Sequence, residues 1–190
     1  MYPDIALASA SPRRRELLAQ LPVNFTLVSA DIDESVLAGE EPASYVSRLA
    51  LQKAQAGANK LNWQLPVLGA DTSVILDRQI LGKPESKAHF MQMLRQLSGR
   101  SHQVLTAVAI VSAGQQLQAL SSTEVWLRPL SDTELDAYWQ SGEPADKAGG
   151  YGIQGLAARF VEKIHGSYTG VVGLPLCETE RLIQQLRRSA

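Results

Sequence analysis

The feature that most constrains the fold is the run over residues 104–111, which is apolar on both faces. A strand of this kind has to be covered on both sides, as in the centre of an α/β sheet. A second apolar and β-branched run over residues 65–76 predicts another buried strand. Turn residues follow both runs, at Asp77-Arg78 and Ala113-Gly114, and predict hairpins. The sheet is therefore expected to be mixed rather than purely parallel.

Helices alternate with these strands along the chain. Apolar residues at helical spacing predict a helix over residues 86–97, with Ser86 as its cap. Ser131 and Glu134 form a capping-box pattern that opens a helix ending near residue 140. The remaining expected elements are helices over residues 12–20 and 42–58 and from Pro175 onward, strands over residues 5–7, 25–28, 116–127 and 157–164, and loops over residues 31–41 and 142–155. We expect one α/β domain over residues 1–190.

Composition excludes several functional classes. The formal net charge is −1, whereas a general nucleic-acid coat or a binder of anionic membranes is strongly basic. No apolar run approaches the ~18 residues of a membrane span, and the first arginines follow the apolar N-terminal stretch instead of preceding it as in a secretory signal. We therefore expect no nucleic-acid or membrane partner and a cytoplasmic location. The single cysteine, Cys177, excludes an intramolecular disulfide and is expected in the core.

Three arginines, Arg13 to Arg15, stand in the first turn of the helix that Ser11-Pro12 opens. The positive end of the helix dipole makes a cation there unfavourable by ~0.3–1 kcal/mol. A bound anion would reverse that sign, because free N–H groups and guanidinium groups would all face it. The alternative is a solvated basic turn balanced by Glu16.

An acidic side chain, Asp71, interrupts the apolar strand over residues 65–76. A carboxylate buried there costs several kcal/mol unless it is paired or binds a metal. A metal ligand or a general base is thus favoured over a simple turn residue, since Val74-Ile75-Leu76 continues the apolar run.

Further charges are candidates for an anion or cation site. Lys53 falls on the apolar face of its helix, and Lys83 is in the rigid segment Gly82-Lys83-Pro84. Each is more often a surface lysine, but together with the arginines they supply the charge that a triphosphate needs. The acidic loop of Asp31, Asp33 and Glu34 has oxygen ligands for a divalent cation, or is simply solvated.

A glycine-rich segment over residues 142–155 contains Gly150, Gly152 and Gly155 in the G-x-G-x-x-G spacing of dinucleotide-binding sites. That fingerprint follows a strand and opens a helix, whereas here a helix precedes it and a strand is expected after it, which disfavours a Rossmann unit. No Walker A sequence is present. Backbone N–H groups of the segment can still bind phosphate or a base edge, with Gln154 as donor and acceptor.

Taken together, the motifs resemble one family along nearly the whole chain, from about residue 5 to residue 186. They are Leu7-Ala8-Ser9-Ala10-Ser11-Pro12-Arg13-Arg14-Arg15, Gly69-Ala70-Asp71-Thr72, Gly82-Lys83-Pro84, Ser98-Gly99-Arg100-Ser101-His102-Gln103-Val104, Asp146-Lys147-Ala148-Gly149 and Val172-Gly173-Leu174-Pro175. This set, in this order, is similar to the Maf family of nucleoside triphosphate pyrophosphatases. The resemblance implies a two-lobed α/β fold with a long mixed sheet, flanking helices and a central cleft, similar to inosine triphosphate pyrophosphatases.

The resemblance also implies cleavage of a nucleoside triphosphate between its α- and β-phosphates, with a divalent metal, Mg²⁺ or Mn²⁺. Asp71 matches the family's proton acceptor, and Asp71 with Glu34 would hold the metal. The branch resembling dTTP/UTP pyrophosphatases has arginine, threonine and glutamine at three specificity positions, which here are Arg13, Thr72 and Gln154. The other matching positions are Ser9, Arg13 and Arg14 for phosphate and Glu34, Lys53 and Lys83 in the cleft.

A second hypothesis stays open at this point. The chain would then be a regulatory nucleotide-binding protein that affects cell division, with incidental hydrolysis. The set Arg13, Lys53, Asp71 and Lys83 favours the enzyme, because binding alone requires no base. Family analogy also predicts a homodimer.

Overall fold

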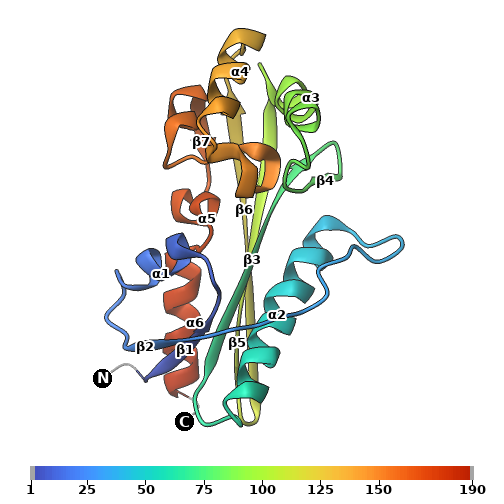
Figure 1. The fold of residues 1–190 in the computed structure, drawn as a ribbon. Helices are drawn as coiled ribbons and strands as arrows, with labels where there is room; N and C mark the ends of the chain where they lie inside the picture. The colour runs from blue at the N-terminus through green and yellow to red at the C-terminus, as the bar shows by residue number, and fades with distance from the viewer. Residues whose placement is uncertain (1–2, 189–190) are drawn as a thin grey trace.

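The computed structural model describes residues 3–188, whose strands form one seven-stranded sheet (Figure 1). Neighbouring strands follow the order β2-β1-β3-β5-β6-β7, and β4 pairs with β3. The β1–β2 and β1–β3 pairs are parallel and the other pairs antiparallel, which confirms a mixed sheet. The strands are β1 (Ile5–Ala8), β2 (Phe25–Val28), β3 (Val67–Leu76), β4 (Gln79–Leu81), β5 (Ser101–Ser112), β6 (Gln115–Leu127) and β7 (Val161–His165).

Helices flank the sheet and begin at the capping residues that the sequence predicts. The side chains of Ser11, Ser86 and Ser131 accept backbone N–H groups at the starts of α1, α3 and α4, and Ser131 forms the expected capping box with Glu134. The helices are α1 (Pro12–Leu18), α2 (Pro42–Lys60), α3 (Lys87–Leu97), α4 (Asp132–Gln140), α5 (Tyr168–Val172) and α6 (Leu176–Arg188), with 3₁₀ turns η1 (Glu143–Asp146), η2 (Ala148–Gly150) and η3 (Leu156–Phe160).

Long strands β3, β5 and β6 run through both lobes of the molecule (Figure 1). One lobe carries α3, α4, β4 and β7 and packs around Phe90 and Phe160. The other lobe carries β1, β2, α1, α2 and α6, and has an apolar cluster on each face of the sheet. Alternate residues of β1 divide between these clusters, with Leu7 on the α6 side and Ala6 on the α2 side. The expected two-lobed α/β fold is confirmed.

Two sequence predictions need correction. The strand expected over residues 157–164 begins only at Val161, because the preceding residues form the turn η3. In that turn Ala157 and Phe160 are buried at the i, i+3 spacing of a 3₁₀ helix, and the residues between them are exposed. Cys177 is exposed, not in the core, because the buried face of α6 is formed by Thr179, Leu182, Ile183 and Leu186.

No helix within residues 3–188 is long and apolar enough to cross a membrane.

Candidate active site

A cleft with a volume of about 650 Å³ is lined by residues from both lobes. One wall comes from the start of α1, the middle of β3 and the α2 lysine, and the opposite wall comes from residues 143–155. Nine residues that the sequence predicted for the site border this cleft: Ser9, Arg13, Arg14, Glu34, Lys53, Asp71, Thr72, Lys83 and Gln154. Asp31 and Asp33 of the acidic loop do not border it; Asp31 pairs with Lys60, and Asp33 accepts the Ser35 N–H.

The centre of the first wall is an ion pair between α2 and β3. Lys53 Nζ donates a hydrogen bond to Asp71 Oδ1 at 2.7 Å, and the two residues are only 9% and 7% exposed. Gly69 allows α2 to approach this closely, because a Cβ at that position would lie 2.3 Å from the Ala50 carbonyl oxygen. Asp71 lies within β3, which continues to Leu76 as the apolar residues after Asp71 predict.

Glu34 joins this pair from the loop between β2 and α2. Its Oε1 atom is 2.7 Å from the same Lys53 Nζ, so one ammonium group bridges two carboxylates. Burial raises the pKa of Asp71 above its usual value, and the attraction of Lys53 opposes this shift without cancelling it. A carboxylate whose pKa is raised is a stronger base once it has ionised, which suits a proton acceptor.

The donor set of this wall fits a divalent metal. The oxygens of Asp71 and Glu34 converge on one cationic group, so both are within reach of a single ion. Carboxylates are the hard ligands that Mg²⁺ prefers, and Mg²⁺ sites often use one or two of them together with water and substrate phosphates. Within residues 3–188, no three His, Cys, Asp or Glu side chains form a metal cluster. Asp71 and Glu34 could hold a divalent ion together with water or other ligands.

Arg14 and Thr72 belong to a hydrogen-bond chain that ends at Gly173, in the loop before α6, and at Gly170 in α5. Arg14 donates from Nε to the Gly173 carbonyl at 2.8 Å and from Nη2 to Thr72 Oγ1 at 3.2 Å. Thr106 Oγ1 lies 2.7 Å from the Gly170 carbonyl oxygen and 3.0 Å from Thr72 Oγ1. Desolvation of its guanidinium group lowers the pKa of Arg14.

The Thr72 hydroxyl oxygen is the acceptor in both of its contacts. Arg14 Nη2 donates to it, and Thr106 Oγ1 shares its single hydrogen between Thr72 Oγ1 and the Gly170 carbonyl oxygen. These contacts do not use the hydrogen of the Thr72 hydroxyl, and Thr72 borders the cleft, so this hydroxyl can donate to a ligand there.

Ser9 and Arg13, at the start of α1, both border the cleft. Ser9 Oγ accepts the Ser11 N–H at 3.2 Å, which shapes the turn into the helix. A hydrogen bond from Lys147 holds the pKa of Asp146 below its usual value, and the charge of Arg13 lowers this pKa further by a smaller amount.

The glycine-rich wall is held together by Glu143, which the sequence gave no reason to select. Its carboxylate accepts the Tyr138 hydroxyl at 2.7 Å and the Leu156 N–H at 2.8 Å. Gly155 fits against it so tightly that a Cβ there would lie 2.2 Å from Oε2. Gln154, which is exposed in the cleft, is thereby presented by a tied segment.

Lys147 and Tyr151 complete that wall and were also not predicted. Lys147 Nζ binds the Glu143 carbonyl and Asp146 Oδ1, both at 2.7 Å. The Tyr151 hydroxyl is 2.6 Å from Nε2 of His102, a residue of β5 that is 3% exposed. Burial lowers the pKa of His102 to about 4. The loop of Lys83 is tied to this wall as well, because Gly149 N–H donates to the Gly82 carbonyl at 3.0 Å.

Comparison with known proteins finds relatives that match nearly the whole chain. A protein of Vibrio parahaemolyticus serotype O3:K6 (strain RIMD 2210633), named dTTP/UTP pyrophosphatase, is 54% identical over 182 residues, which cover 96% of each chain. A protein of the same name from Pseudoalteromonas translucida (strain TAC 125) is 56% identical over 184 residues, or 97% of each chain. A solved dITP/XTP pyrophosphatase from Mycobacterium abscessus aligns with a TM-score of 0.43 and 19% identity over 65% of this chain and 74% of its own, a likeness too weak to carry an argument.

A family model described as Maf-like protein matches residues 4–186. The match includes both walls of the cleft and all the elements that position them. The chain therefore belongs to the Maf family.

Proposed function

We propose that this protein hydrolyses dTTP and UTP to the nucleoside monophosphate and pyrophosphate. The observation that carries the proposal is the buried Asp71 carboxylate in the cleft, paired with Lys53, which also binds Glu34. The cleft volume of about 650 Å³ is within the ~300–1,000 Å³ of small-molecule sites. The relatives named dTTP/UTP pyrophosphatase, at more than half identity over nearly their full length, support the same activity.

Asp71 is the group that accepts the proton in this scheme. The oxygen of a water molecule attacks the α-phosphorus, the bond from that phosphorus to the bridging oxygen breaks, and pyrophosphate leaves with the electron pair. Asp71 takes the proton of the water, and Lys53 holds the carboxylate in place for it. Arg13, Lys53 and Lys83 offset the negative charge of the phosphates.

A divalent metal, Mg²⁺ or Mn²⁺, is part of the proposal. Bound by Asp71 and Glu34, it would neutralise phosphate charge and lower the pKa of the attacking water. The convergence of both carboxylates on one cationic group supports this ligand pair.

The base is recognised by hydrogen bonds from the glycine-rich wall and from β3. Uracil and thymine carry an N3–H donor between two carbonyl acceptors. The Gln154 amide can accept from the N3–H and donate to one of the carbonyls, and the Thr72 hydroxyl, whose hydrogen its contacts leave available, can donate to a carbonyl of the base. Cytosine lacks the N3–H, so it leaves an acceptor unpaired, at a cost of ~1–3 kcal/mol.

The test is pyrophosphate release from dTTP, UTP, CTP, ATP, GTP and 7-methyl-GTP with Mg²⁺ or Mn²⁺. We expect the highest kcat/KM with dTTP and UTP, whose bases differ by one methyl group and whose kcat/KM values should differ by about 10-fold or less, and poor turnover of the purines. A best kcat/KM on a purine triphosphate would overturn the proposed base selectivity and leave the chemistry standing. Nucleotide binding without pyrophosphate release would favour the regulatory hypothesis. The homodimer and the cytoplasmic location stay predictions.

A further inference from the structure

The loop between β2 and α2 has no helix or strand of its own over residues 29–41, yet it carries Glu34 into the cleft. Glu34 has a side chain that is 56% exposed, and its ion pair is with Lys53. Only the Lys53 partner of this pair is buried, and a pair that solvent reaches on one side does little by itself to offset the entropy lost when the loop backbone is ordered. The position of Glu34 therefore depends on what holds its backbone.

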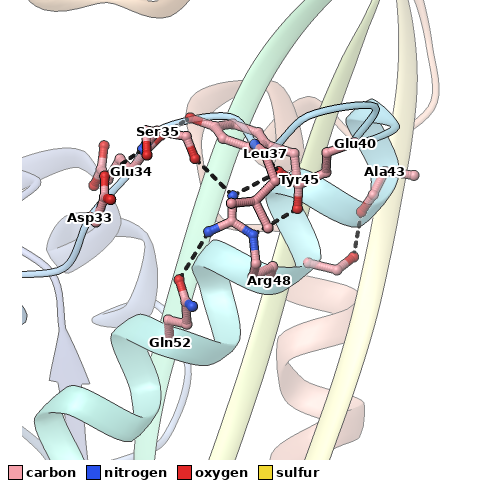
Figure 2. Close-up of polar contacts among 10 residues, drawn as sticks. Asp33, Glu34, Ser35, Leu37, Glu40, Ala43, Tyr45, Arg48 and Gln52 are labelled. Atoms are coloured by element: carbon pink, nitrogen blue, oxygen red, sulfur yellow. Dashed lines mark hydrogen bonds and ion pairs between the residues drawn. The ribbon is translucent and has the colours of Figure 1, made fainter.

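Side chains of α2 hold that backbone (Figure 2). Tyr45 donates its hydroxyl to the Glu34 carbonyl at 2.8 Å, and Arg48 Nη2 donates to the Ser35 carbonyl at 3.0 Å. Two consecutive carbonyls, starting with that of Glu34 itself, are thus tied to one helix.

The same arginine also fixes the far end of the loop. Arg48 binds Glu40 through two bonds, from Nε to Oε1 and from Nη2 to Oε2, both at 2.7 Å. Such a planar two-point contact with a carboxylate is specific in geometry as well as strong. Gln52 Oε1 accepts Nη1 at 3.1 Å, and the guanidinium carbon lies 5.6 Å from the centre of the Tyr45 ring (Figure 2). Arg48 is therefore held in one orientation from several sides.

We propose that Arg48 and Tyr45 are positioning residues, which place Glu34 beside Lys53 and Asp71 without touching the substrate themselves. The inference rests on the proposed function for its catalytic consequence, and on the contacts of the loop for its structural part. Groups that orient a metal ligand or a catalytic carboxylate typically change metal affinity or activity by ~10–100-fold when they are removed.

The experiment compares Arg48→Met with Arg78→Met. Arg78 is a matched control, because it also pairs with a glutamate of this region, Glu41, but both side chains are largely exposed. We expect Arg48→Met to lower kcat/KM for dTTP by ~10–100-fold and Arg78→Met to change it by less than about 2-fold. In a Glu34→Gln background, Arg48→Met should add less than about a 2-fold loss, because it acts through Glu34. A full additional loss in that background would overturn the proposal.

Two readouts do not depend on turnover. Amide hydrogen exchange over residues 34–40 should accelerate in Arg48→Met and not in Arg78→Met. Binding of Mn²⁺, followed by electron paramagnetic resonance, should weaken by ~10–100-fold in Arg48→Met alone. Tyr45→Phe removes one hydroxyl, keeps the ring, and should shift both readouts in the same direction by less.

The possible failures are distinguishable. Unchanged exchange and unchanged Mn²⁺ binding in Arg48→Met would overturn the positioning role whatever the enzyme does. A wild-type protein that releases no pyrophosphate would overturn the proposed function, and the exchange measurement would still decide the role of Arg48.

Discussion

The two walls of the cleft are built in different ways. The wall of Asp71 and Lys53 stands on a ten-residue strand and a nineteen-residue helix, and its charges are nearly buried. The wall of Gln154 consists of short 3₁₀ turns and loop segments held by side-chain hydrogen bonds to Glu143. The two walls therefore depend on different structural support: regular secondary structure in one and side-chain hydrogen bonds in the other. Proton transfer needs fixed charges in a dry environment, and long regular elements supply both, whereas the wall of Gln154 is fixed by side-chain contacts between loop segments.

The largest expected effect comes from removing the proton acceptor of the first wall. Asp71→Asn keeps the volume of the side chain but cannot accept the proton, so turnover should fall by ~10²–10⁴-fold. The loss should appear mainly in kcat, with a smaller loss of dTTP affinity, because asparagine is also a poorer ligand than a carboxylate for the divalent metal. Steady-state kinetics and circular dichroism measure activity and folding together. Retention of more than about a tenth of wild-type turnover would remove Asp71 from the catalytic centre.

The sequence predicted the first wall because its signals are local. Asp71 stands out as a carboxylate within an apolar strand, and Lys53 stands out on an apolar helix face. Both patterns describe burial, and a buried charge has to have a partner. The helices and strands around them were also predicted from local signals, because hydrophobic periodicity and capping residues can be recognised within a short stretch of sequence.

The second wall could not be predicted in the same way. Glu143 and Lys147 are ordinary charged residues of a glycine-rich loop, and Tyr151 is an ordinary aromatic one. Their roles come from contacts with residues such as Tyr138 and His102, which only the folded chain brings near. No local pattern encodes such pairings, although the tight fit of Gly155 against Glu143 explains one glycine of the segment.

Lowering the pH should reduce the free energy of unfolding through His102, whose ring contacts the Tyr151 hydroxyl of the second wall. Its pKa is about 4 in the folded protein and 6.5 in an ordinary histidine, so between these values the unfolded chain binds more protons. Stability from this residue is full above pH 6.5 and is lost as the pH falls toward about 4, with a slope of up to ~1.4 kcal/mol per pH unit. His102→Gln should flatten this slope in urea unfolding between pH 4.5 and 7, whereas the exposed His165→Gln should not. Equal slopes for wild type and His102→Gln would refute the assignment.

A glycine substitution tests whether Glu143 really holds the second wall. In Gly155→Ala the new methyl group displaces the Glu143 carboxylate from Tyr138 and Leu156, and overpacking of this kind costs ~1–3 kcal/mol. We expect a higher KM for dTTP with a smaller change in kcat, because Gln154 moves and Asp71 does not. Gly82→Ala is the control, since nothing lies within 4 Å of a Cβ built at that position. A change confined to kcat would contradict the division of tasks between the walls.

The smallest expected effect separates two neighbouring arginines of the first wall. Arg14 is tied to the Gly173 carbonyl and to Thr72, so Arg14→Ala should destabilise the protein without ligand by ~1–3 kcal/mol. Arg13→Ala removes a cation from the first turn of α1, where the dipole disfavours it, and should leave the stability without ligand unchanged or raise it by at most ~0.3–1 kcal/mol. Added dTTP should stabilise Arg13→Ala less than it stabilises the wild type, because Arg13 offers its charge to the phosphates. Urea unfolding with and without dTTP measures both quantities. If Arg13→Ala loses as much stability as Arg14→Ala when no nucleotide is bound, then Arg13 is a structural residue like its neighbour and its charge is not reserved for the substrate.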